Sequence, residues 1–346
     1  MKALRLTRWG KPAELCDVAT PVPGPGQVLI KVAGAGACHS DLHLMDWPEG
    51  LLAWKLPFTI GHENAGWVYE VGTGVTSVTP GEAVLVYGPW GCGQCPPCRL
   101  GRENYCEHAA ELGGAGGGLG FDGGMAEYML VPSARLLVPL GDFDPMQAAP
   151  LADAALTPYH AIAGSRDRLH PGATAVVIGV GGLGQMAIQL LKATTAARII
   201  AVDTSDRKLE IARTLGADVV VHSDAGAASA IRNATSGGGA DVVLDLVGSD
   251  ATLALGAKLL RAEGRLVIVG LARGTLPVSF FALPYGAEIA TSYWGTVTEL
   301  IELVTLARAK RIRVGVETVP LGQAPQVYER LSRGEIRGRA VVVPGR

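Results

Sequence analysis

Short apolar runs rich in β-branched residues, separated by glycine and proline, fill the first 142 residues of the chain. They include VLIKVAGAG at 28–36, NAGWVYEVG at 64–72, EAVLVYG at 82–88, AEYMLVP at 126–132 and ARLLVPL at 134–140. Runs of this length between turn residues predict strands. The opening MKALRLTRWG alternates apolar and charged residues, which predicts a further, half-buried strand. This part of the chain is therefore expected to be rich in β-structure.

A different pattern follows the segment DFDPMQAAP: strand-like runs alternate with longer apolar stretches of helical period. The strand-like runs lie at 173–181, 197–203, 217–221, 240–248 and 264–270. Strands that alternate with helices predict an α/β fold with a doubly wound parallel sheet.

The end of the chain returns to the first pattern. From about Tyr293 the sequence predicts one more helix, GTVTELIELVTLARAK, and then short strands that end in GRAVVVPGR at 338–346. We therefore expect a β-rich domain of residues 1–153 and 293–346, into which an α/β domain of residues 154–292 is inserted.

Composition and charge narrow the classes of partner. The chain has 346 residues, 48% of them hydrophobic, and 30 basic against 32 acidic side chains leave a formal charge of −2. No basic block is longer than a pair, so we expect neither a nucleic-acid nor a membrane partner. The most apolar stretch, Ala173–Leu191, is interrupted by glycines, which argues against a bilayer span. The opening lacks the apolar run of a signal peptide, so we expect a cytoplasmic protein.

The hexapeptide GVGGLG is a candidate dinucleotide site, made by Gly179, Gly181, Gly182, Leu183 and Gly184. It follows an apolar strand and opens a helix, the context in which this pattern binds a pyrophosphate. The first glycine permits a tight turn, the second lets the backbone approach the phosphates, and the third lets helix and strand pack closely. The amide groups at the helix N-terminus then face the phosphate.

An acidic residue at the end of the next strand favours NAD over NADP. Asp203 stands nineteen residues beyond Gly184, where a carboxylate accepts hydrogen bonds from the ribose hydroxyls and repels a 2′-phosphate. Lys208, one turn later, is a candidate contact to the adenosine ribose, and an exposed helical lysine is the alternative. A glycine-rich turn without a ligand is the alternative to the whole site.

Four of the six cysteines lie within the segment GCGQCPPCRLGRENYC. Cys92, Cys95, Cys98 and Cys106 have the spacing C-x2-C-x2-C-x7-C. Four thiolates close a tetrahedral structural zinc site, which would stabilise a lobe, about residues 90–110, that is too polar to form a core. An iron–sulfur cluster is the alternative, but in its usual cysteine run three residues separate the last two cysteines and a proline follows. Here seven residues separate Cys98 from Cys106. Clustered thiols in a chain of this size also argue against a disulfide framework.

A second group of metal-ligand residue types occurs in ACHSDLH and GHENAG. A catalytic zinc needs three protein ligands and an open coordination position. Cys38 and His62 can supply two of them, and Asp153, in LADAALTPYHA, is the candidate for the third. Each residue taken alone also fits a structural role: a buried thiol, a core histidine and a carboxylate at a helix start.

The order of these segments along the chain resembles that of a known family. The segments ACHSD, GHENAGWVYEVGTGVTSVTPGEAV, the four-cysteine lobe, VIGVGGLG and GEIRGRAVV occur in the order typical of zinc-dependent alcohol dehydrogenases of the medium-chain dehydrogenase/reductase superfamily. The resemblance covers essentially the full chain. YGPWGCG, RENYC, LTPYHA and YWGT are similar to bacterial, actinobacterial-type secondary-alcohol dehydrogenases. The resemblance to this family implies a GroES-like catalytic domain joined to a Rossmann dinucleotide-binding domain.

The resemblance also implies roles for individual residues. Catalytic zinc would be held by Cys38, His62 and Asp153, with Glu63 as an occasional further ligand, and Asp41 would orient His62. The four lobe cysteines would hold a second, structural zinc ion. Ser40 would take the proton of the substrate hydroxyl and His43 would pass it to solvent, while His39 and Arg339 would contact the cofactor pyrophosphate. Many relatives have a second cysteine in place of Asp153, and some close relatives lack a histidine at position 43.

The implied reaction is reversible hydride transfer between NAD and a secondary or primary alcohol, giving a ketone or aldehyde. Bulky apolar residues in pocket-lining segments favour aliphatic or aryl-alkyl secondary alcohols: Trp54, Leu119, Tyr293 and Trp294. Two alternatives remain, namely a polyol or amino-alcohol dehydrogenase of the same superfamily, and a non-enzymatic NAD-binding protein that keeps only the structural zinc. The resemblance further implies a homo-oligomer, with a tetramer favoured over a dimer.

Overall fold

The computed structural model describes residues 1–345, which form two compact units. The first unit contains Met1–Leu156, Gly295–Arg308 and the chain from Val314 onward; the second contains Thr157–Trp294 and Ala309–Arg313. Both ends of the sequence thus belong to one unit, and the middle forms the other. Arg346, which ends the predicted closing segment, lies outside the described residues.

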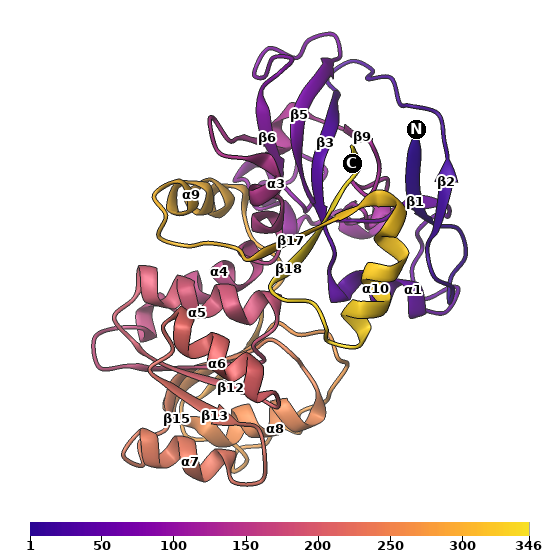
Figure 1. Ribbon diagram of the computed structural model, residues 1–346. Coiled ribbons are helices and arrows are strands. Elements are labelled where there is room, and N and C mark those ends of the chain that lie inside the picture. Colours follow the sequence, from indigo (N-terminus) through magenta and orange to yellow (C-terminus); the bar gives the residue numbers. More distant parts are fainter. Residues whose placement is uncertain (346) are drawn as a thin grey trace. The chain divides into compact units, whose positions relative to one another are not determined.

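Three sheets form the β-structure of the first unit, and Figure 1 shows β3, β5 and β6 side by side. A seven-stranded sheet has the order β10-β6-β5-β3-β18-β17, with β9 also paired to β3; a three-stranded sheet has the order β2-β1-β4, and β7 pairs with β8. The bounds are β1 Lys2–Leu6, β2 Glu14–Asp17, β3 Val28–Gly36, β4 Phe58–Thr59, β5 Glu63–Val71, β6 Ala83–Val86, β7 Gly116–Gly117, β8 Gly120–Phe121, β9 Tyr128–Val131, β10 Leu137–Pro139, β17 Val316–Pro320 and β18 Arg339–Val343.

The central antiparallel pair, β3 and β5, places two candidate ligands next to each other. Every residue of β3 except Lys31 is buried, as expected for a strand in the middle of a sheet. The last residue of β3, Gly36, is the register partner of the first residue of β5, Glu63. Because the end of β3 lies opposite the start of β5, Cys38 and His62 are both at this edge of the sheet.

Helices of the first unit are few and short. Figure 1 shows α10 beside α1, and their apolar faces share one core that includes Leu44, Met45, Val327 and Tyr328. The helix bounds are α1 His39–Asp46, α2 Pro96–Arg99, α3 Pro145–Ala148, α9 Val297–Arg308 and α10 Ala324–Ser332, with 3₁₀ turns at Glu103–Tyr105, Ala109–Glu111, Ala134–Leu136, Ala149–Ala152 and Leu321–Gln323.

The second unit is a six-stranded parallel sheet in the order β13-β12-β11-β14-β15-β16. Numbered along this unit the order is 3-2-1-4-5-6, that of the doubly wound dinucleotide-binding fold. The strand bounds are β11 Thr174–Ile178, β12 Arg198–Asp203, β13 Val219–His222, β14 Ala240–Asp245, β15 Leu260–Ile268 and β16 Glu288–Thr291. The helix bounds are α4 Leu156–Ala163, whose first residue belongs to the first unit, α5 Gly182–Thr194, α6 Asp206–Leu215, α7 Ala227–Ala234 and α8 Asp250–Leu259, with a 3₁₀ turn at Arg166–Arg168.

The predicted α/β fold class is confirmed by this sheet, because β11, β12 and β14 are mostly buried apolar runs and each is followed by a helix. Strand β16 was not predicted: its sequence EIAT is short and only partly buried at the end of the sheet. Among the helices of residues 1–345, none combines the length and apolarity needed to cross a bilayer.

Candidate functional site

Cys38, His62 and Asp153 converge in the first unit. Cys38 precedes α1, His62 precedes β5, and Asp153 follows the 3₁₀ turn Ala149–Ala152. One ligand atom from each lies within 4.8 Å of the other two, and all three side chains are buried. Oδ2 of Asp153 is 3.5 Å from Sγ of Cys38 and 3.6 Å from Nε2 of His62.

This donor set fits a zinc ion. A tetrahedral ion with bonds of about 2.0–2.3 Å keeps its ligand atoms about 3.3–3.8 Å apart, which matches the observed separations. Burial alone lowers the pKa of His62, but the carboxylates of Asp41 and Asp153 outweigh burial and raise that pKa well above its ordinary value. The cluster therefore favours a positive charge at this position, as a cation would provide.

Asp41 fixes the orientation of the His62 ring. Its Oδ1 is 3.0 Å from Nδ1 of His62, so that Nε2 is left to face Asp153. Its Oδ2 accepts hydrogen bonds from the backbone N–H of Cys38, at 3.0 Å, and from the hydroxyl of Tyr328, at 2.8 Å. Sequence reasoning missed Tyr328, because it lies 287 residues from Asp41 in an ordinary amphipathic helix without a motif.

Glu63 is engaged by Arg339 in this structure. Nε of Arg339 is 2.8 Å from Oε2 of Glu63, Nη2 also donates to Oε1, and both side chains are buried. A third contact joins Nη2 of Arg339 to Oδ2 of Asp153 at 3.3 Å. A Cβ at Gly36 would lie 1.8 Å from Oε2 of Glu63, so glycine is needed there to admit the carboxylate. Thus Glu63 is outside the three-residue ligand group, and Arg339, expected at the cofactor pyrophosphate, contacts two carboxylates instead.

The candidate proton-path residues lie on the first turns of α1. Oγ of Ser40 is 3.6 Å from Sγ of Cys38, which places the hydroxyl beside the ligand group. Ser40 and His43 are both partly buried and occupy positions i and i+3 of the helix, so they share a face. His39, expected to contact the cofactor, is exposed at the start of the helix.

Cys92, Cys95, Cys98 and Cys106 form the other group of candidate metal ligands, with all four Sγ atoms within 4.8 Å of one another. The Sγ–Sγ distances are 4.0 Å for Cys92 and Cys98 and 4.0 Å for Cys95 and Cys106, close to the edges of a zinc–thiolate tetrahedron. All six cysteines of the chain are free of disulfides.

Backbone amides support thiolate character in this lobe. The N–H groups of Gln94 and Cys95 donate to Sγ of Cys92 at 3.4 and 3.3 Å. These bonds lower the pKa of Cys92 to about 6. This thiol of lowered pKa and its three neighbouring sulfurs have the donor set of a metal site.

The glycine turn of the second unit has the geometry of a dinucleotide site. Gly179 has φ +92°, and a Cβ at Gly184 would lie 2.0 Å from the carbonyl oxygen of Gly179, so helix and strand approach too closely for a side chain. A Cβ at Gly181 would meet nothing within 4 Å, which leaves that backbone open to a ligand. Gly182 and Leu183 begin α5 and are partly buried.

Asp203 ends β12 and braces the glycine turn. Its Oδ2 accepts from the N–H of Val180 at 2.7 Å, its Oδ1 accepts from the N–H of Ser205 at 3.0 Å, and Nζ of Lys208 is 3.9 Å from Oδ2. The carboxylate is therefore held beside the turn at the carboxyl end of the strand, the edge at which doubly wound sheets bind dinucleotides.

The four expected pocket residues belong to different units. Trp54 and Leu119 pack against the core of the first unit. In the second unit, Tyr293 is 46% exposed and Trp294 is buried, with their ring centroids 6.0 Å apart.

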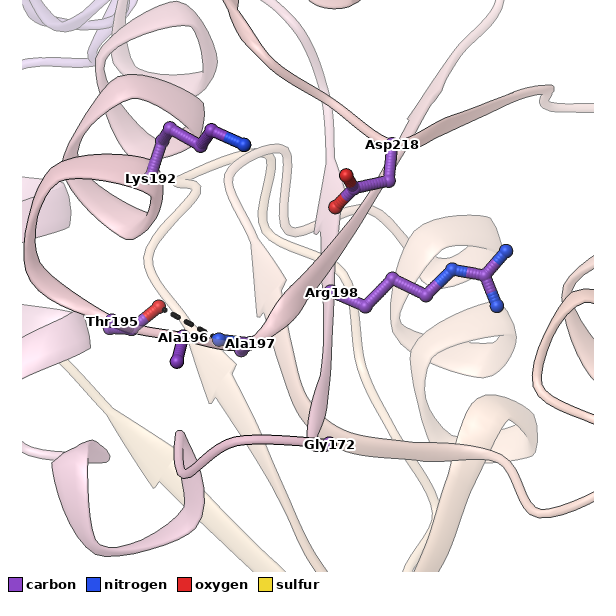
Figure 2. A pocket seen from close by; sticks show the side chains of 7 residues that line it. All are labelled: Gly172, Lys192, Thr195, Ala196, Ala197, Arg198 and Asp218. Atoms are coloured by element: carbon purple, nitrogen blue, oxygen red, sulfur yellow. Dashed lines mark hydrogen bonds between the residues drawn. The ribbon is translucent and has the colours of Figure 1, made fainter.

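A cavity of about 450 Å³ lies elsewhere on the second unit, as Figure 2 shows. It adjoins the amino ends of β12 and β13, the edge of the sheet opposite the glycine turn, and Oδ2 of Asp218 accepts there from the N–H of Ile199. None of the predicted site residues lines it. Its lining residues are Gly172, Lys192, Thr195, Ala196, Ala197, Arg198 and Asp218.

Two family models match most of this chain. Residues 24–142 match the family model described as alcohol dehydrogenase GroES-like domain, and residues 182–309 match the model described as zinc-binding dehydrogenase. An NAD-dependent alcohol dehydrogenase of Sulfurisphaera tokodaii is 38% identical, over 99% of this chain and 100% of the relative.

Two further relatives extend the comparison. A D-arabinose 1-dehydrogenase (NADP⁺) of Saccharolobus solfataricus is 35% identical, over 99% of this chain and 97% of that protein. The crystal structure of the alcohol dehydrogenase of Aeropyrum pernix superposes with a TM-score of 0.92 at 40% identity, over 99% of this chain and 100% of that one.

Proposed function

This chain belongs to the zinc-binding alcohol dehydrogenases of the medium-chain dehydrogenase/reductase superfamily, and we propose how its residues carry out their NAD-dependent reaction. It is an oxidoreductase that transfers hydride reversibly between NAD and an alcohol. The observation that carries the assignment of the active site is the convergence of Cys38, His62 and Asp153.

We assign the catalytic zinc to these three side chains. They would hold the ion through sulfur, nitrogen and oxygen donors, and three protein ligands are the number with which a catalytic zinc stays open to substrate. When bound, zinc supplies a Lewis acid that lowers the pKa of an alcohol hydroxyl, and NAD supplies the hydride acceptor. The burial of all three side chains excludes bulk water from the ligand group.

The remaining roles follow from the same geometry. Ser40 Oγ takes the proton of the alcohol, and His43, on the same face of α1, passes it to solvent. Glu63 would become a ligand only if Arg339 released it, and the same release would free Arg339 to meet the cofactor pyrophosphate. His39, exposed at the start of α1, would also contact the pyrophosphate. The four lobe cysteines hold the second, structural zinc ion.

The two units have different proposed roles. We propose that the first unit is the GroES-like catalytic domain and that the second binds NAD through the Gly179–Gly184 turn and Asp203. The carboxylate of Asp203 favours NAD over NADP, and Lys208 contacts the adenosine ribose.

The substrate class is proposed from bulky apolar side chains. Aliphatic or aryl-alkyl secondary alcohols are favoured by the bulky side chains of Trp54, Leu119, Tyr293 and Trp294. The segments that are similar to actinobacterial secondary-alcohol dehydrogenases agree with this substrate class. The relatives described above are archaeal. A second candidate is a polyol or sugar substrate, which the D-arabinose dehydrogenase relative favours.

We also propose a cytoplasmic homo-oligomer, with a tetramer favoured. Phe280, Phe281 and Tyr285 of the second unit are more than two-thirds exposed, at 74%, 88% and 71%, and such aromatic surface is typical of protein contacts. Light scattering of the purified protein would give its mass: a monomer would contradict this part of the proposal.

One assay tests the proposed function. Initial rates are measured with NAD and with NADP against 2-butanol, 1-phenylethanol and sugar alcohols, before and after chelation. We expect NAD-dependent oxidation of the secondary alcohols that is lost on chelation and restored by zinc. Faster turnover of sugar alcohols would support the second candidate. One zinc per chain with no hydride transfer to any substrate would instead support a non-enzymatic NAD-binding protein.

A further inference from the structure

The hydroxyl of Tyr328 lies next to Asp41, the carboxylate that is bonded to the ring of His62. Its Oη donates to Oδ2 of Asp41 at 2.8 Å, and the two side chains are 4% and 0% exposed. Tyr328 lies on α10, and its ring packs in the core that α10 shares with α1. The bond therefore joins the far end of the chain to the carboxylate that faces His62.

Asp41 connects two of the three ligand residues. Oδ1 is bonded to the ring of His62, and Oδ2 is bonded to the backbone N–H of Cys38. Within residues 1–345, the side chain that donates a hydrogen bond to this Oδ2 is that of Tyr328. Without this hydroxyl, the second oxygen of a fully buried carboxylate would keep a single amide partner.

We propose that Tyr328 is a positioning residue of the catalytic zinc site, which acts through Asp41 to hold the imidazole of His62 in its ligating orientation. This inference rests on the proposed zinc site and adds a residue to it. Groups that orient ligating histidines typically contribute 10- to 100-fold to metal affinity, so about 10-fold is expected for a residue one bond further away.

The electrostatics keep Tyr328 in the donating form. Burial and the charge of Asp41 both raise the pKa of the Tyr328 hydroxyl well above its ordinary value, so it stays protonated. A buried carboxylate needs its full set of donors, because an oxygen without one carries the desolvation cost of a charged group. The carboxylate that loses Tyr328 can then turn, and the ring of His62 turns with it.

The test compares two buried tyrosines. Tyr328→Phe removes the hydroxyl bonded to Asp41, and Tyr87→Phe removes a hydroxyl that is equally buried but bonded to the carbonyl oxygen of Gly295 at 2.5 Å. Zinc release from the full-length, zinc-loaded protein is followed with a chromogenic chelator. In Tyr328→Phe, one of two ions should leave about 10-fold faster than in the unsubstituted protein, while the ion of the cysteine lobe is unaffected. Tyr87→Phe should leave the release of that faster ion unchanged.

Asp41→Asn provides a second arm, because it removes the residue through which Tyr328 is proposed to act. Adding Tyr328→Phe to Asp41→Asn should change zinc release by much less than it does alone, since the two residues share one interaction. Cobalt substitution gives a readout independent of rate: the ligand-field bands of the catalytic site should shift in Tyr328→Phe and stay unchanged in Tyr87→Phe. If Tyr328→Phe cannot be purified, 3-fluorotyrosine at position 328 keeps the ring and strengthens the donor, so release should slow.

The outcomes separate this inference from the site on which it rests. If the unsubstituted protein binds zinc only in the cysteine lobe, the proposed catalytic site is wrong. If it binds two ions and Tyr328→Phe releases both at the original rates, or no faster than Tyr87→Phe, the positioning role is wrong. Full additivity of Tyr328→Phe and Asp41→Asn would also overturn it.

Discussion

Arg339 and Glu63 form a buried ion pair at the edge of the proposed zinc site, with Nε of the arginine 2.8 Å from Oε2 of the glutamate. Glu63 is 0% exposed, and within residues 1–345 it also accepts a hydrogen bond from the N–H of Ala154, at 3.0 Å from Oε1. The two residues are 276 positions apart, so the pair fastens the closing strand β18 to the start of β5.

Removing one partner of this ion pair should lower the stability of the folded protein. We expect Arg339→Met to lower the free energy of unfolding by about 3–5 kcal/mol, because it leaves a buried carboxylate without its cation. Glu63→Gln combined with Arg339→Met should recover part of that loss. Chemical denaturation with Arg330→Met as the control measures the difference, since Arg330 pairs with Glu317 in a partly exposed ion pair. Equal losses in Arg339→Met and Arg330→Met would contradict the prediction.

Cys38→Ala should remove the catalytic zinc and leave the structural ion. The loss of the sulfur donor leaves two protein ligands, so zinc content should fall from two ions per chain to one and kcat/KM should fall by about a thousandfold. Metal analysis and initial rates check both effects. Cys16→Ala is the matched control, because Cys16 lies on β2 outside both ligand groups. A Cys38→Ala protein that retains two zinc ions would show that the ligand set is wrong.

Asp203→Ser should weaken the preference for NAD. The substitution removes the carboxylate that repels a 2′-phosphate, and it leaves Lys208, now 3.9 Å from Oδ2 of Asp203, able to pair with that phosphate. We expect kcat/KM with NAD to fall about 10- to 100-fold, while the value with NADP is unchanged or higher. The control is Asp206→Ser on the exposed first turn of α6. An unchanged ratio of the two cofactors would count against Asp203.

The stability of the second unit should depend on pH through Glu288 on β16. Hydrogen bonds from Arg265, together with the charges of Arg265 and Arg168, lower the pKa of Glu288 below its ordinary value of 4.5. A lowered pKa in the folded state means that the carboxylate stabilises the fold above pH 4.5 and loses this effect as the pH falls below it.

Glu288→Gln should therefore lower the melting temperature at neutral pH, and the difference from the original protein should shrink toward zero below pH 4. High salt should reduce the same difference, because Glu288 is exposed and its ion pairs are screened. Calorimetry over this pH range is the measurement. A difference that stays constant down to pH 3 would exclude this carboxylate as the cause.

Local sequence patterns predicted much of this molecule. The glycine turn of residues 179–184 and the four lobe cysteines are each contained in a short segment, so their spacing alone sets their geometry. The strands β3 and β11 were predicted closely because continuous buried apolar runs leave no other role for them.

Contacts between distant segments could not be derived in this way. The bond from Tyr328 to Asp41 depends on how α10 packs against α1, which no spacing in either segment encodes. The pairing of Arg339 with Glu63 has the same origin, because both residues were singled out but for other partners. The short strand β16 was missed because an edge strand of four partly buried residues lacks a clear period.

A crystal structure with anomalous data at the zinc edge tests the proposed active site most directly. We expect two peaks per chain, one surrounded by the four lobe cysteines and one within about 2.4 Å of Cys38 Sγ, His62 Nε2 and a carboxylate oxygen of Asp153. A single peak in the cysteine lobe, or a second peak away from these three side chains, would contradict the assignment of the catalytic zinc.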